Sequence, residues 1–267
     1  LRAAVVDVVT WHAGLRTVYP EGADGPFGIV LDDAAAVVGP LTAADDDPAA
    51  IVEALAGRPF DLTVDAPLRV GLSSAGDTHT LVLAIHHIAA DGASLPLIVG
   101  DLIRTYRERL AGRATAWQAA PLDYRDYALA MAQADDGGID DDRRYWADRL
   151  SGAPGETSIA ADATLADRSG GAMVSVPVDT DLRDALLAFA RSNTTSAFSV
   201  LHTATVALLH RLGLGTDLVI GTPVANRNPR GTAADDYRQV VGMFVNTVAL
   251  RTAVDPGGTA QSLLDAV

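Results

Sequence analysis

Two adjacent histidines followed by an aspartate and a glycine are the residues of this sequence best suited to chemistry. They are His86 and His87, with Asp91 and Gly92 closing the segment 86–92. A free imidazole has a pKa of about 6.5, so its neutral ring accepts a proton at physiological pH. Such a ring can serve as a general base when an amine or alcohol attacks a carbonyl. We therefore expect acyl-transfer chemistry here, with one of the two histidines as the catalytic residue.

The elements around this segment predict how the histidines are presented. Residues 80–85 form a nearly continuous apolar run, which is typical of a strand covered on both faces. Because side chains alternate along a strand, His86 and His87 should point in opposite directions. Ser94 is expected to cap a helix that ends near Gly112. One histidine can therefore be structural while the other faces a cavity.

The remaining residues of the segment are expected to support the loop. Asp91 could hold an arginine or a backbone amide, and Gly92 should permit a backbone angle or close approach that a side chain would block. A metal site is disfavoured because His86 and His87 diverge and no third ligand is obvious nearby. The other histidines are interpreted as structural or surface residues: His12, His79, His202 and His210.

Composition excludes several classes of function. The 267 residues include no cysteine, which removes disulfides and thiolate chemistry, and the formal net charge of -14 argues against binding to nucleic acid. We find no apolar run of about 18 residues that could span a membrane and no secretory signal. These features predict a cytoplasmic protein that does not bind membranes.

Two lobes are expected, 1–155 and 156–267, with a boundary in the Gly-, Ala- and Ser-rich stretch after residue 150. In the first lobe, strands at 66–72 and 80–86 are predicted to form a hairpin. In the second lobe we predict these elements: a strand at 173–178, helices near 180–192 and 196–212, and a strand at 217–221. A first helix without a cap and a last helix without a stop signal indicate a fragment lacking both ends.

Several segments, in a fixed order, resemble condensation domains of nonribosomal peptide synthetases, which belong to the chloramphenicol acetyltransferase-like superfamily. The segments are residues 11–19, 86–92, 124–128, 145–150, 221–227 and 242–247. The His-His-x-x-x-Asp-Gly pattern is shared across the superfamily. The other segments restrict the resemblance to condensation domains of nonribosomal peptide synthetases. Trp11 and Ala13 depart from the family's arginine and glutamate, and Asn226 replaces a glycine.

The resemblance implies an α/β, chloramphenicol acetyltransferase-like fold, with two lobes in a V-shaped pseudo-dimer and the second lobe incomplete. A channel between the lobes would admit phosphopantetheine arms from donor and acceptor peptidyl carrier proteins, and an adenylation domain would be adjacent. The acceptor amine would attack the donor thioester to form a peptide bond. The domain itself would bind no cofactor, and its setting would be antibiotic biosynthesis or other secondary metabolism.

The resemblance also implies roles for single residues. His87 would be the catalytic residue in the channel, where it takes a proton from the attacking amine or hydrogen-bonds it. His86 would be buried and orient the loop. Asp91 would pair with Arg227 across the lobes, or act as a simple loop cap. Ser94 and Asn246 are possible channel residues, although Asn246 would equally suit a strand end where its amide satisfies backbone groups. The amino acids joined, the donor stereochemistry and the oligomeric state are not readable from the sequence.

Four alternatives share this resemblance. A coenzyme-A-dependent acyltransferase would use the same histidine loop. An epimerisation domain usually has tryptophan after the serine, where Leu95 and Pro96 follow Ser94 here. A cyclising domain replaces the histidines with aspartates. An inactive domain that recruits partner enzymes usually loses the second histidine or the glycine, and this chain keeps His87 and Gly92.

Overall fold

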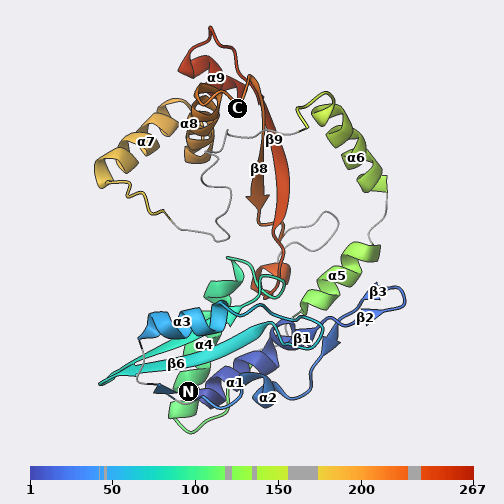
Figure 1. Ribbon diagram of the computed structural model, residues 1–267, viewed down its shortest axis with the longest axis vertical. Coiled ribbons are helices and arrows are strands. Elements are labelled where there is room, and N and C mark those ends of the chain that lie inside the picture. Colours follow the sequence, from blue (N-terminus) through green and yellow to red (C-terminus); the bar gives the residue numbers. More distant parts are fainter. Residues whose placement is uncertain (42, 45–46, 118–121, 134–136, 156–173, 228–235) are drawn as a thin grey trace, which may run out of the picture. The chain divides into compact units, whose positions relative to one another are not determined.

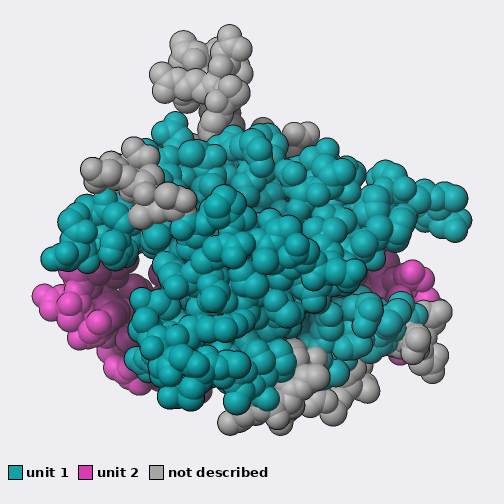
Figure 2. Space-filling model, turned by 90° about the horizontal axis from the view of Figure 1, so that it is seen from below, with its two compact units in different colours: residues 1–134, 224–246 teal, residues 135–223, 247–267 magenta. Residues whose placement is uncertain are grey.

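The structure is a computed structural model that describes residues 1–41, 43–44, 47–117, 122–133, 137–155, 174–227 and 236–267. By their contacts the residues fall into unit 1, Leu1–Ala134 with Val224–Asn246, and unit 2, Asp135–Pro223 with Thr247–Val267 (Figure 2). This boundary lies earlier than the predicted one after residue 155. It also places residues 224–246 with unit 1, whereas the prediction assigned them to the second lobe.

Unit 1 contains the elements that carry the histidine loop (Figure 1). Its helices are α1 (Arg2–Trp11), the short η1 (Ala13–Arg16), α2 (Ala34–Val38), α3 (Pro48–Ala56), α4 (Ser94–Leu110), α5 (Tyr124–Gln133) and the short η3 (Asp236–Gln239). Its strands are β1 (Thr17–Val18), β2 (Glu21–Gly22), β3 (Gly25–Pro26), β4 (Ile29–Val30), β5 (Ala43–Ala44), β6 (Leu68–Ala75) and β7 (Thr78–Ile85). Strand β1 pairs with β4, β2 with β3, and the order β5-β6-β7 forms a sheet of its own.

The predicted hairpin is confirmed as β6 and β7, which pair antiparallel from Leu68 opposite Ile85 to Ala75 opposite Thr78. The connection is only two residues long, and its first residue, Gly76, has a φ of 59°. Glycine suits that position because a side chain is disfavoured in the left-handed region. The hairpin therefore delivers the chain to His86 immediately after its last paired residue.

The core of unit 1 extends into the histidine loop. Buried valines of α1 and residues of α2 and α4 pack with Ala89 and Ala90, which are 2% and 7% exposed. Helix α1 packs against α4, and α3 packs against β6 and β7. Because its two alanines are core residues, the middle of the loop is anchored by apolar burial.

Unit 2 contains α6 (Gly137–Leu150), α7 (Thr180–Ser192), α8 (Ala197–Arg211) and α9 (Ala260–Ala266). It also contains the paired strands β8 (Asp217–Val224) and β9 (Asn246–Ala253), except for the end residues Val224 and Asn246, which group with unit 1. The side chains of Asp179 and Ser196 cap α7 and α8 by accepting hydrogen bonds from backbone N–H groups of the first turn. Within the described ranges, no helix is long and apolar enough to cross a bilayer.

The strand predicted at residues 173–178 is wrong for 174–178, which form no strand, while residue 173 lies outside the described residues. Val174 and Val176 are 84% and 78% exposed. Valine-rich segments favour strands chiefly when neighbouring strands and a packed face receive their side chains. That support is not provided by the described part of unit 2, so local propensity alone does not produce a strand here.

The close contact of α3 with the sheet depends on Gly71 of β6. A Cβ at this position would lie 2.6 Å from Cγ2 of Ile51 and 2.9 Å from Cδ1 of Leu55, both in α3. We expect Gly71→Ala to lower the free energy of unfolding by about 1–3 kcal/mol because the helix must shift. Urea denaturation measures this change. Gly100→Ala is the matched control, since nothing lies near its Cβ and alanine favours an exposed helix position. Equal stability of the two variants would contradict the proposed contact.

Candidate active site

The histidine loop leaves β7 at His86 and enters α4 at Ser94. The backbone N–H of His86 donates to the carbonyl of Pro67 at 2.9 Å, and the N–H of Ala89 donates to the carbonyl of His86 at 3.0 Å. The first bond continues the pairing of β6 and β7 beyond Ile85, and the second closes a turn over residues 86–89. The first half of the loop therefore has a defined backbone.

The two histidines differ in exposure. His87 is exposed, whereas His86, which was expected to be buried, is half-buried. The Nδ1 atom of His86 accepts a hydrogen bond from the Ile88 N–H at 3.1 Å, so the ring closes the turn around His87. The expected contact of His87 with a channel between lobes stays a prediction.

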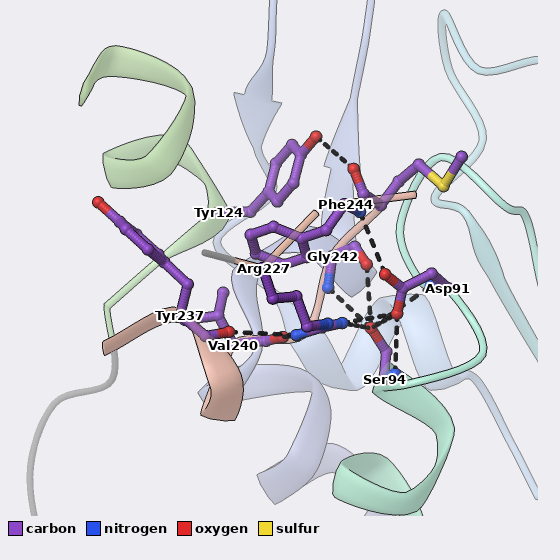
Figure 3. Close-up of polar contacts among 9 residues, drawn as sticks. Asp91, Ser94, Tyr124, Arg227, Tyr237, Val240, Gly242 and Phe244 are labelled. Carbon is purple, nitrogen blue, oxygen red and sulfur yellow. Dashed lines mark hydrogen bonds and ion pairs between the residues drawn. The ribbon is translucent and has the colours of Figure 1, made fainter. Parts of the chain in front are cut away.

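Asp91 is the most heavily bonded residue of the loop (Figure 3). The residue is 2% exposed, and its Oδ1 accepts from Arg227 Nη2 at 2.6 Å. The same oxygen accepts from the N–H of Ser94 at 2.9 Å, and Oδ2 accepts from the N–H of Phe244 at 3.2 Å. The two expectations for Asp91, an ion pair with Arg227 and a cap of backbone amides, are therefore both realised.

The partner of this carboxylate is itself buried and fixed. Arg227 is 9% exposed, and its Nη1 donates to the carbonyls of Val240 at 2.6 Å and Tyr237 at 3.2 Å. Its Cζ lies 4.3 Å from the centre of the Phe244 ring. The ion pair was expected across the lobes, but both residues belong to unit 1, because the segment 224–246 groups with the histidine loop.

Ser94 joins the loop to the segment around Gly242. Its hydroxyl lies 2.8 Å from Asp91 Oδ1 and 2.9 Å from the carbonyl of Gly242, and it accepts from the Gly242 N–H at 3.1 Å. A hydroxyl has one hydrogen, so it donates to one of these two oxygens at a time. The expectation that Ser94 caps α4 is wrong: the N-cap residue is Ala93, and the carboxylate of Asp91 satisfies the Ser94 N–H instead.

Glycine is required at Gly242 rather than at Gly92. A Cβ on Gly242 would lie 2.2 Å from Cδ2 of Tyr124, whereas nothing lies within 4 Å of a Cβ on Gly92. The φ of Gly92 is also outside the left-handed region. Within the described residues, the expectation that Gly92 permits an unusual angle or a close approach is therefore wrong. The hydrogen bonds between Asp91 and Ser94 shape the turn with ordinary backbone angles.

A cluster of mostly aromatic side chains packs beside Arg227. It consists of Tyr127, Tyr237, Val240 and Phe244, with Tyr124 packed against it. The Tyr124 hydroxyl donates to the carbonyl of Met243 at 2.6 Å. Tyr124 and Tyr127 therefore pack beside the site. Sequence reasoning missed the backbone N–H of Phe244 as a donor, although the segment 242–247 stood out by its resemblance.

The electrostatics of the site favour an ionised Asp91. Burial by itself would raise the pKa of this carboxyl, but the hydrogen bonds from Arg227, Ser94 and Phe244, together with the Arg227 charge, lower its pKa below the ordinary value. The carboxylate is thus charged at neutral pH and acts as an anchor. In the part of the chain that is described, no group of three or more His, Asp or Glu side chains could hold a metal ion. Asn246 begins β9 with an exposed side chain, and its role in a channel stays a prediction.

Comparisons with known proteins define the class to which this chain belongs. The Condensation domain family matches residues 1–267, so the chain is a member of that family. In nonribosomal peptide synthetases such domains are amide-forming acyltransferases. Solved structures confirm the expected chloramphenicol acetyltransferase-like α/β fold.

Particular relatives come from peptide synthetases and related assemblies. A probable non-canonical nonribosomal peptide synthetase of Salinispora arenicola is 37% identical over 97% of this chain and 3% of its own length. A dimodular nonribosomal peptide synthase of Bacillus subtilis is 33% identical over 100% of this chain and 12% of its own length. The chain therefore spans a small part of these relatives.

Two solved structures illustrate the range of the fold. The X-domain from teicoplanin biosynthesis, in complex with OxyB, is 28% identical with a TM-score of 0.79, and the match covers 99% of this chain and 59% of that one. The first condensation domain of the calcium-dependent antibiotic synthetase is 23% identical with a TM-score of 0.74, over 99% and 63% of the two chains. The second likeness shows the fold alone.

Removing the buried carboxylate should cost much more than removing an exposed one. We expect Asp91→Asn to lower the free energy of unfolding by about 3–5 kcal/mol, because the Arg227 charge stays buried without its counter-ion. The control is Asp184→Asn, which breaks an exposed pair with Arg183 and should change stability by less than about 1 kcal/mol. Chemical denaturation of both variants measures the difference. A small and equal effect would show that the ion pair does not hold the loop.

The same carboxylate predicts a pH dependence of stability. Because folding lowers the pKa of Asp91, its contribution is fully present above the pKa of the unfolded chain, about 4, and is lost as pH falls through the folded value. We expect the stability difference between wild type and Asp91→Asn to be constant near neutral pH and to shrink in acid. Denaturation of both proteins from pH 7 to pH 3 would reveal this. A difference that grew in acid would contradict the direction of the shift.

Proposed function

We propose that this chain forms a peptide bond between a donor aminoacyl or peptidyl thioester and an acceptor aminoacyl thioester. Both substrates would be carried on phosphopantetheine arms of carrier proteins. The observation that supports this most directly is the exposed imidazole of His87, presented by a loop that a buried ion pair anchors at Asp91, in a member of the condensation domain family.

The reaction needs one bond to form and one to break. The acceptor nitrogen attacks the donor carbonyl carbon, a C–N bond forms, and the C–S bond breaks to release the donor arm as a thiol. His87 takes a proton from the nitrogen, or hydrogen-bonds it in the tetrahedral state, and the sulfur leaves with a proton. Tethering of both substrates supplies the rest of the rate enhancement through their orientation.

The anchored loop explains how an exposed side chain can be placed accurately. The loop is fixed at Ala89 and Ala90 by burial and at Asp91 by charge-assisted hydrogen bonds. His87 therefore needs little reorganisation when the substrates arrive. Asp91 and Arg227 act on the reaction through the loop, and they do not contact the reacting atoms in this proposal.

Donor and acceptor carrier proteins and an adjacent adenylation domain are the partners that this function requires. The relatives are synthetases, one of them described as dimodular, and such proteins join domains in one chain. A coenzyme-A-dependent acyltransferase would use the same chemistry with a free thioester. The two are separated by whether a donor on coenzyme A replaces a donor on a carrier protein.

Recruitment of a partner enzyme is a second candidate function. Its support is the likeness to the X-domain that was solved in complex with OxyB. Against it stand the presence of His87 and Gly92, one of which such domains usually lose. A chain that only recruits would bind its partner without forming a dipeptide.

The decisive variant is His87→Ala in the natural full-length protein, assayed with donor and acceptor carriers loaded in advance. We expect dipeptide formation to fall about 100- to 10,000-fold, because general-base help is lost. His87→Gln distinguishes the roles, since it can hydrogen-bond the amine but cannot take its proton. A rate in His87→Gln near that of wild type would assign His87 to hydrogen bonding.

The control for these variants is His79→Ala, which removes another exposed histidine of unit 1 at the tip of the hairpin. Its rate should equal that of wild type. Unchanged dipeptide yield in His87→Ala would remove His87 from the mechanism. No dipeptide from the wild-type protein, together with binding of a partner enzyme, would favour recruitment.

A further inference from the structure

We infer that Phe60 and Arg69 are positioning residues for His87 and act through the ring of His86. The inference rests on the proposed function, and it extends the site beyond the segments that carry the family resemblance. It starts from an aromatic ring that contacts an arginine and a loop histidine at once.

Arg69 is held in one orientation at the start of β6. Its side chain is 11% exposed, so its five N–H donors are largely removed from water. It donates hydrogen bonds to four acceptors: the carbonyls of Leu55 at 2.9 Å, Arg58 at 2.5 Å and Pro59 at 2.8 Å, and Asp65 Oδ2 at 3.3 Å. The guanidinium therefore fixes the backbone that leads directly into Phe60.

Phe60 receives the face of that guanidinium. The Cζ of Arg69 lies 3.7 Å from the centre of the phenyl ring, within the range of a cation–π contact. Because the carbonyls of Arg58 and Pro59 are bonded to the same side chain, Arg69 holds both the ring and the backbone that precedes it. The position of Phe60 is thus set by β6 rather than by its own loop.

The phenyl ring in turn restricts His86. The two ring centres are 5.6 Å apart and the planes meet at 78°, a favourable perpendicular contact. His86 Nδ1 accepts from the N–H of Ile88, so a rotation of the imidazole would break the bond that closes the turn. His87 lies between these two residues, and its backbone direction follows from that turn.

The histidine loop is therefore held at both ends by an arginine. At the Asp91 end Arg227 acts through an ion pair, and at the His86 end Arg69 acts through Phe60. Burial of Ala89 and Ala90 fixes the middle. Without Phe60, the His86 N–H would still donate to the carbonyl of Pro67. The His86 imidazole, however, would lose the aromatic ring that packs against it.

The test compares Phe60→Leu and Arg69→Lys with wild type in the natural full-length protein, using loaded carriers. Each substitution keeps bulk or charge but removes the stacked contact. We expect kcat to fall about 10- to 100-fold with KM for the carriers unchanged, because misplacement of a catalytic group acts on the chemical step. Phe60→Tyr keeps the aromatic ring, so its kcat should equal that of wild type. Arg2→Lys is the control, since Arg2 also donates to backbone carbonyls, at Gly39 and Ala35.

A second readout does not depend on activity. Nitrogen-15 NMR of the histidine rings shows whether the Nδ1 of His86 still accepts a hydrogen bond, and we expect this signal to change in Phe60→Leu and to be retained in Phe60→Tyr. An unchanged His86 signal in Phe60→Leu would overturn the inference. So would a loss of kcat that merely follows the folded fraction measured by circular dichroism. If the wild type forms no dipeptide, the proposed function fails, and the His86 signal alone decides the positioning role.

Discussion

The buried ion pair of Asp91 and Arg227 is the interaction on which the site depends. Charges removed from water are costly, and they are tolerated only when their remaining hydrogen-bonding groups are satisfied with good geometry. Here both oxygens of Asp91 accept hydrogen bonds, and Arg227 also donates to the carbonyls of Tyr237 and Val240. The histidine loop and the segment 236–244 can therefore pack in only one relative position, because any displacement would leave a buried charge without its hydrogen-bonding partners.

Close packing adds a second constraint to this electrostatic one. Gly242 brings its backbone against the ring of Tyr124, and its amide and carbonyl both reach the hydroxyl of Ser94. The Phe244 ring of the aromatic cluster lies against the Arg227 guanidinium. Functional loops are commonly more mobile than the elements they connect. In this protein buried contacts hold the loop at residues 89–91, while the side chain of His87 is exposed.

The fold of this chain also occurs in proteins that are described in different ways. The chain is similar both to synthetases and to an X-domain solved in complex with OxyB. Fold alone does not separate catalysis from docking, because function lies in the residues that the fold presents. An anchored loop serves either use, since accurate placement helps a catalytic imidazole and a rigid surface helps a docking partner. The chemical difference lies at His87 itself.

The sequence by itself predicted the hairpin and a difference in environment between His86 and His87, and the resemblance implied the pairing of Asp91 with Arg227 as one of two alternatives. These follow from local alternation and from recognisable segments. Only the tertiary structure decided that Ser94 bonds to the Gly242 backbone rather than capping α4, and that residues 174–178 form no strand. Such outcomes depend on which distant segment fills the space beside a residue. The local propensity of a segment does not specify that neighbour. The neighbour is selected by burial and by hydrogen-bond satisfaction in the folded chain.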